Sequence, residues 1–225
     1  FNIASTNTAI QASTSISAST STITIDSGST SFKAATGLTL DTCTVTAKVS
    51  QASSALAELT SGNFKITRGS FVGTSAGRGF VLGGTVTPAT FYNLSGNVAL
   101  ATGGDGLDGT TGSTARYSGG IFRVTGAAGT KSIDLADGDP ALFLYGVSIT
   151  DGGVSQPNIV IRSQASYTWA ATAPDALWSD AASWAGGEVP KNTDIVRFEA
   201  PYLLAAGVDR RVGAQLRFPA HAAIG

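Results

Sequence analysis

The chain has 225 residues, of which 42% are hydrophobic and only 13% are charged, and its formal net charge is −1. About a quarter of the residues in a typical globular protein are charged. The surface therefore lacks the basic field that attracts nucleic acid or anionic lipid, and we expect no nucleic-acid partner. No apolar run reaches the length of a membrane span, so we expect no membrane insertion.

Residues 1–22 are rich in Ser, Thr, Ala, Asn and Ile and carry no charged side chain. Their low complexity is typical of a linker or tail. The spaced isoleucines Ile3, Ile10 and Ile16 instead favour a strand or arm that packs along a partner surface. We expect an extended N-terminal arm.

Residues 23–164 form a body of short strands in which apolar and small polar residues alternate. Ile23 and Ile25 lie on one face of "TITID", and "TVTAKV" alternates in the same way; a period of two residues indicates a β-strand. The segment 50–62, "SQASSALAELTSG", has helical composition, and we expect one short helix there. Cys43 lies among alternating apolar residues, which favours a buried, inert thiol over an intermolecular disulfide.

The ends of these strands bear on the fold class. The runs "TITIDSG", "FKITRGS" and "VSITDGG" each end at a polar or glycine corner. Such corners are typical of a parallel β-helix, in which successive coils stack through similar turns. Few strands are joined by the two-residue turns that mark hairpins. We expect an all-β protein with a parallel β-helix or solenoid body, and the alternative is a β-sandwich.

Residues 165–225 form a C-terminal segment that contains all three tryptophans. Residues 168–198 resemble the tryptophan-rich module of bacterial autotransporter-type passenger proteins. The matching residues are Trp169, Trp178, Trp184, Gly186, Gly187, Pro190, Asp194 and Val196. The resemblance implies a β-solenoid in an extracellular setting and no specific activity. The composition of the body also resembles that of phage tail fibres, tailspikes and other virion appendages, which are often trimers.

The tryptophans have two interpretations. Large aromatic side chains bury much area and close the end of a core, which makes the segment a structural plug. Alternatively, exposed rings of Trp169, Trp178 and Trp184 stack on sugar rings and bind a carbohydrate.

Two acidic clusters are candidate calcium sites. Residues 103–111, "GGDGLDGTT", resemble the calcium-binding nonapeptide of repeat-in-toxin proteins, with Asp105 and Asp108 as its carboxylates. Asp134, Asp137 and Asp139 cluster in "DLADGDP", and carboxylate oxygens are hard ligands that suit calcium. The alternative interpretations are a flexible glycine loop and an acidic turn. A pair of carboxylates could also hydrolyse a glycoside, but we expect no catalytic residue among these acids.

The function class follows from these patterns. His221 is the only histidine, so the sequence indicates neither a Ser-His-Asp triad nor a zinc site. We expect a structural or adhesive subunit of an extracellular or virion appendage, such as a phage fibre, a spike, a decoration-type protein or a surface adhesin. The alternatives are a tailspike-like polysaccharide hydrolase or lyase and a carbohydrate-binding module. We expect self-association, as a homotrimer or a larger array, and a surface glycan as a further partner.

Overall fold

A computed structural model describes residues 1–138, 141–163, 166–170, 177–185, 187, 189–190 and 195–197. The chain divides into two compact units, Phe1–Ser163 and Gln164–Gly225. This division lies where the composition changes and the tryptophan-rich segment begins.

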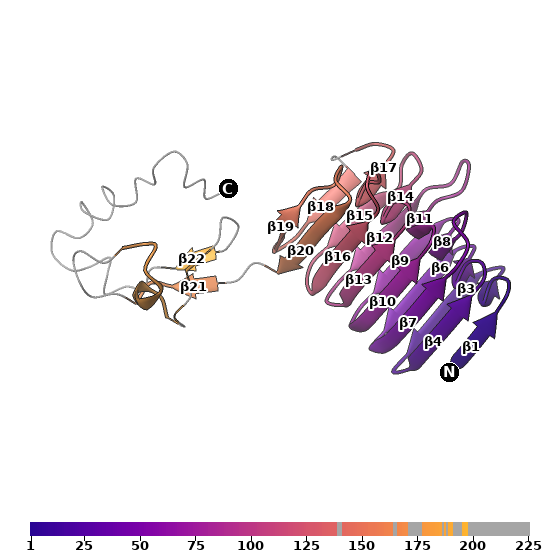
Figure 1. Ribbon diagram of the computed structural model, residues 1–225, viewed down its shortest axis with the longest axis horizontal. Coiled ribbons are helices and arrows are strands. Elements are labelled where there is room, and N and C mark those ends of the chain that lie inside the picture. Colours follow the sequence, from indigo (N-terminus) through magenta and orange to yellow (C-terminus); the bar gives the residue numbers. More distant parts are fainter. Residues whose placement is uncertain are drawn as a thin grey trace. The chain divides into compact units, whose positions relative to one another are not determined.

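The first unit is a parallel β-solenoid in which each coil contributes one strand to each of three sheets (Figure 1). Sheet A contains β1 (Asn2–Ser5), β4 (Thr22–Ser27), β7 (Cys43–Val49), β10 (Gly69–Ser75), β13 (Asn97–Thr102) and β16 (Ile121–Gly126). Sheet B contains β2 (Ile10–Ala12), β5 (Phe32–Ala34), β8 (Ala55–Leu59), β11 (Arg78–Leu82), β14 (Leu107–Gly109) and β17 (Ile133–Leu135). Sheet C contains β3 (Ser15–Ser19), β6 (Gly37–Asp41), β9 (Gly62–Ile66), β12 (Ala89–Asn93), β15 (Thr114–Tyr117) and β18 (Leu142–Leu144).

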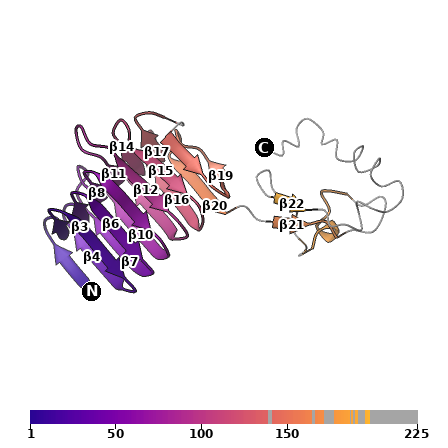
Figure 2. The same cartoon turned by 180° about the vertical axis from the view of Figure 1, so that it is seen from behind.

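A reversed hairpin ends the parallel stack. Strands β19 (Val147–Gly152) and β20 (Asn158–Ser163) are antiparallel to each other, and β20 is also antiparallel to β16. Figure 2 shows from behind how this hairpin continues sheet A beyond β16. The parallel register of sheet A therefore ends at β16.

Aromatic side chains run along the interior of the solenoid. Inward and outward residues alternate along most strands, as in the burial of β7. The inward side chains include a chain of rings whose centroids lie 4.8–6.2 Å apart: Phe32, Phe71, Phe80, Phe64, Phe91, Phe122 and Tyr117. These rings join successive coils into one hydrophobic core, and rings in tilted or edge-on contact stabilise the core beyond the area that they bury.

The predicted parallel β-solenoid is confirmed, and no sandwich forms. The predicted helix over residues 50–62 is wrong, because these residues form β8 and the start of β9. Ala57 lies in register between Phe32 and Phe80. A small side chain is suited to this position between two large rings, and stacking in the sheet overrides helix propensity.

Residues 1–22 contain the three strands of the first coil, where we had expected an extended arm. Ile3, Ile10 and Ile16 pack against the core and are register partners of Ile25, Phe32 and Leu38. The number of residues between successive isoleucines is therefore the number that separates a strand in one sheet from the next strand of the same coil. Each isoleucine starts an inward column that later coils continue.

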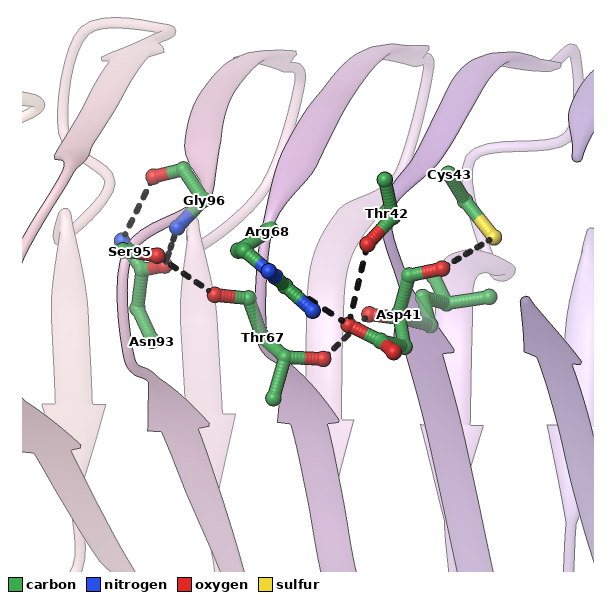
Figure 3. Close-up of polar contacts among 9 residues, drawn as sticks. Asp41, Thr42, Cys43, Thr67, Arg68, Asn93, Ser95 and Gly96 are labelled. Carbon is green, nitrogen blue, oxygen red and sulfur yellow. Dashed lines mark hydrogen bonds and ion pairs between the residues drawn. The ribbon is translucent and has the colours of Figure 1, made fainter. Parts of the chain in front are cut away.

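The corners between sheets C and A are held by side-chain hydrogen bonds (Figure 3). The Asn93 side chain donates to the Gly96 carbonyl and accepts from the Gly96 amide. Ser95 Oγ donates to the Thr67 carbonyl of the preceding coil. Cys43 is buried, as expected, and its thiol lies 3.4 Å from the carbonyl oxygen of Asp41.

In the second unit, β21 (Ser166–Thr168) pairs in parallel with β22 (Ile195–Arg197). A short 3₁₀ turn, η2, spans Ala181–Ser183 and is capped by the Asp180 side chain. Across the part of the chain that the structure describes, no helix has the length and apolar character needed to cross a membrane.

Candidate functional site

The outer face of sheet C carries a column of aromatic and cationic side chains. Lys65, Tyr92, Arg116 and Phe143 are successive register partners on β9, β12, β15 and β18. Tyr145 follows β18 in the same coil as Phe143. Neighbouring parallel strands lie about 4.8 Å apart, so Lys65, Tyr92, Arg116 and Phe143 form one line along the stack, and Tyr145 lies beside Phe143 in the last coil of this line. We name these five residues the aromatic–cation column.

Each cation of this column contacts a ring. Lys65 Nζ lies 5.6 Å from the centroid of the Tyr92 ring, and Arg116 Cζ lies 4.4 Å from the centroid of Phe143. Arg116 Nη1 also donates to the Tyr145 hydroxyl at 3.3 Å. The rings of Phe143 and Tyr145 are stacked, with centroids 6.5 Å apart. Cation–π contacts position a cation but leave its charge unneutralised.

The two cations have no acidic partner. No ion pair among the described residues joins Lys65 or Arg116 to a carboxylate. The Nε atom of Arg116 is buried and has no hydrogen-bond partner. Beside the column, the hydroxyls of Thr90 and Thr114 are hydrogen-bonded to each other at 3.0 Å. The column therefore offers positive charge next to two hydroxyls.

Asp41, at the end of β6, is the one carboxylate on the strands of sheet C, and it already has hydrogen-bond and ion-pair partners. Hydrogen bonding from Thr67 is the largest cause that holds the pKa of Asp41 below its usual value, and Thr42 and Arg68 act in the same direction. Arg68 Nε lies 3.7 Å from Asp41 Oδ1 (Figure 3). Asp41 thus pairs at the corner and does not neutralise the column.

Sheet B shows the opposite arrangement, because its outward charges pair with one another. Lys33 lies 2.8 Å from Glu58, and Arg78 lies 2.8 Å from Asp108. Partial burial raises the pKa of Glu58, but hydrogen bonds from Lys33 and Thr30 outweigh it, so that the pKa lies below its usual value. The ion pairs on this face join neighbouring coils, and they neutralise the charges that a ligand could otherwise contact.

The acids proposed as calcium ligands contact donors of the protein itself. Asp105 accepts from the Lys131 amide at 2.7 Å, and Asp137 accepts from the Gly112 amide at 2.6 Å. Asp134 pairs with the Lys131 side chain at 2.9 Å, which raises the pKa of Lys131.

The structure brings one pair of these acids together, since Asp108 and Asp134 are register partners. Asp139 lies outside the described residues. Within the described ranges, no group of three His, Cys, Asp or Glu side chains could hold a metal ion. Calcium at these acids stays a prediction, and the contacts that they make mostly join one coil to the next.

The tryptophans form a small core in the second unit. Trp184 is 2% exposed, and its ring makes edge-on contacts with Trp169 at 5.0 Å and with Trp178 at 4.5 Å between centroids. Trp184 Nε1 donates to the Trp178 carbonyl at 2.9 Å. These rings pack against one another within the second unit, and the ring of Trp184 is not available to stack on a sugar. The structural plug stays a prediction.

Two further surfaces of the solenoid differ from the aromatic–cation column in their chemistry. The outer face of sheet A has mostly small, uncharged side chains, such as Thr22, Thr24, Thr44 and Thr46, and these are exposed. A cavity of about 240 Å³ lies in the last coil, between β17 and the loop before β20, and is lined in part by Ile133 and Val154. Neither surface combines charge with aromatic rings as the aromatic–cation column does.

Comparison of the chain with protein-family models, with curated proteins and with solved structures finds no match. The interpretation of the site therefore rests on the contacts of its residues. Sequence reasoning missed all five members of the aromatic–cation column, because a whole coil separates Lys65, Tyr92, Arg116 and Phe143 from one another along the chain. Only the register of the coils brings them into line.

Proposed function

We propose that the chain is a structural and adhesive module of an extracellular appendage, carried by a cell surface or a virion. The observation that carries this proposal is the aromatic–cation column, whose charges are positioned but not neutralised. Exposed aromatic and cationic side chains that converge on one face are a common basis of recognition. A phage fibre, a spike, a decoration-type protein and a surface adhesin all need such a face on a rigid body.

The solenoid suits a structural role. Every strand from β4 to β15 is hydrogen-bonded to a strand on each side, and a continuous aromatic core joins the coils. In such stacks each coil contacts only its neighbours, so the body is an extended rod that presents its outer faces along its length. A spacer or fibre segment is compatible with this geometry.

The contacts of the described acids favour binding over cleavage. A hydrolase or lyase would need carboxylates free to exchange protons with a substrate. Asp134 is paired with Lys131, and Asp137 accepts from a backbone amide. The tailspike-like hydrolase or lyase is therefore the less favoured proposal. A carbohydrate-binding module that uses the tryptophans is also less favoured, because Trp184 is buried.

Self-association, as a homotrimer or a larger array, is part of this proposal. The strands β1, β2 and β3 end their sheets and have no further strand partner among the described residues. Open strand edges can pair with a further strand, either from another copy or from the same polypeptide. The number three is suggested only by the resemblance to fibre-like appendages.

Retention on a polysaccharide tests the proposal and separates adhesion from catalysis. Purified protein is passed over immobilised capsule or lipopolysaccharide from several bacteria, and the same polymers are assayed for new reducing or unsaturated ends. We expect retention by at least one polymer without new chain ends. New ends would support the hydrolase or lyase instead, and no retention by any polymer would contradict the adhesive role.

A further inference from the structure

We infer that the aromatic–cation column binds a linear anionic polysaccharide, one that carries carboxylate or sulfate groups, with the polymer lying along the stack of coils. This inference rests on the proposed adhesive function and names its ligand class. It assigns the binding to Lys65, Tyr92, Arg116, Phe143 and Tyr145.

The contrast between two faces of the same solenoid indicates an anion. On sheet B, Lys33 and Arg78 each lie 2.8 Å from a carboxylate, which offsets their charge. On sheet C, Lys65 and Arg116 are held by rings, which leave the positive charge in place. A carboxylate or sulfate group can accept hydrogen bonds from the guanidinium nitrogens of an arginine, and it would offset this charge.

The surroundings of the cations favour a sugar polymer over a nucleic acid. Nucleic acid carries a dense row of phosphates, and its binders neutralise many of them with clustered basic residues. Here two cations stand within a chain of net charge −1. Aromatic rings offer apolar faces against which sugar rings can pack. Tyr145 is 51% exposed, and the Thr90 and Thr114 hydroxyls lie beside the column for hydrogen bonding.

The direction of the column favours a linear ligand. Lys65, Tyr92, Arg116 and Phe143 belong to successive coils and lie in register, so the line that they form runs along the stack. Lys65 and Arg116 are two coils apart, which is about 10 Å. This separation is comparable with two sugar units of an extended chain, so regularly spaced acidic groups could meet both cations. An extended polymer would gain several weak contacts at once, which raises its overall affinity.

The test uses the whole chain and four defined polymers: alginate as a polyuronate, dextran sulfate, neutral dextran and a single-stranded oligothymidylate. Arg116→Gln is compared with Arg123→Gln, which removes the same charge from an exposed arginine of β16 on sheet A that also lacks an ion pair. Lys65→Gln is compared with Lys48→Gln on β7, which removes an exposed lysine of sheet A that lies 3.6 Å from Asp26. Arg116→Lys restores the charge without the planar fork. Circular dichroism and unfolding midpoints verify the fold of each variant.

We expect binding of alginate or dextran sulfate that weakens as salt is added. Arg116→Gln should weaken this binding about tenfold or more, as expected for loss of a hydrogen bond to a charged group. Lys65→Gln should weaken it by a smaller factor, Arg116→Lys should restore part of it, and both sheet A variants should leave it nearly unchanged.

Four results would overturn the inference. If Arg116→Gln and Lys65→Gln bind like their sheet A controls, the column is not the site, although the adhesive function stands. If oligothymidylate binds more tightly than both anionic polysaccharides at the same salt concentration, the ligand class is wrong. If neutral dextran binds as well as the anionic polymers, charge does not select the ligand. Failure of all polysaccharides to bind would overturn the proposed function together with the inference.

Discussion

Two polar side chains in the interior illustrate how differently a buried group can be accommodated. Asn93, which is 1% exposed, makes hydrogen bonds to Gly96 and to the Ile121 carbonyl. Tyr117 is equally buried, but its hydroxyl has no hydrogen-bond partner. Burial raises the pKa of the Tyr117 hydroxyl well above its usual value. The ring of Tyr117 contributes to the core, whereas its hydroxyl adds only a desolvation cost.

Tyr117→Phe should therefore stabilise the protein, because it keeps the ring contacts with Phe91 and Phe122 and removes the unpaired hydroxyl. We expect the free energy of unfolding to rise by about 1 kcal/mol. Asn93→Ala is the contrasting variant and should lower it by about 1–3 kcal/mol, since its backbone partners lose their hydrogen bonds. Urea denaturation measures both. A clear loss of stability in Tyr117→Phe would show that the hydroxyl has a partner.

Glu58 gives the protein a pH-dependent contribution to stability. Its pKa is lower in the folded state than in the unfolded chain. The contribution is therefore complete above the unfolded-state pKa, about 4.3 for glutamate, and is lost as the pH falls through the folded-state pKa. We expect Glu58→Gln to be less stable than the parent at pH 7, with the difference shrinking below about pH 4.3. Equal stability of the two proteins at pH 7 would contradict this account.

At the scale of the strands, close packing between two sheets depends on a pairing of large and small residues. Leu56 of β8 is fully buried, and a Cβ atom placed on Gly73 of β10 would overlap its Cδ1 atom. Gly73 therefore leaves the space that Leu56 fills. The side chain of Leu56 and the backbone at Gly73 thus pack closely where sheets A and B meet.

A double-mutant cycle tests this pairing. Leu56→Ala should lower the free energy of unfolding by about 2–5 kcal/mol because it leaves a cavity. Gly73→Val should lower it by about 1–3 kcal/mol because it overpacks the same space. In the double variant the valine occupies the vacated volume, and we expect a favourable coupling of about 0.5–3 kcal/mol. Strict additivity would show that the two residues do not share this space.

The strands show what the sequence can predict about this fold and where such prediction ends. Alternation in "TITID" and "TVTAKV" correctly indicated β4 and β7, and the polar corners correctly favoured a solenoid. The segment 50–62 was misassigned because its alanines have high helix propensity, whereas their place beside the phenylalanines depends on register. The aromatic–cation column could not be predicted from the sequence either, because its alignment also depends on register. The coils differ in length, so the sequence does not indicate which residues of successive coils are neighbours.

At the scale of the whole molecule, the solenoid gives its three outer faces different chemistry. Sheet A is mostly small and uncharged, sheet B is joined by its own ion pairs, and sheet C carries the aromatic–cation column. A stack of coils can vary its outward residues freely because the inward residues alone maintain the core. This independence allows a structural rod to carry an adhesive face.

Deletion of residues 1–21 tests whether the first coil is an arm or a part of the stack. Because each coil contacts only its neighbours, the remaining coils should stay folded, with a lower unfolding midpoint from the loss of one interface. Circular dichroism and urea denaturation measure this. An unchanged midpoint would indicate that residues 1–21 do not contribute to the core. Sedimentation of both forms would also show whether the predicted self-association depends on this coil.

The measurement that tests the central claim most directly is protection of lysines from reductive methylation by bound alginate, read by mass spectrometry. The described strands of each sheet contain one lysine: Lys48 in sheet A, Lys33 in sheet B and Lys65 in sheet C. The protein therefore contains its own controls. We expect alginate to slow the methylation of Lys65 and to leave the rates of Lys48 and Lys33 unchanged. Equal protection of all three lysines, or protection of Lys48 or Lys33 without Lys65, would contradict the assignment of the adhesive face to sheet C.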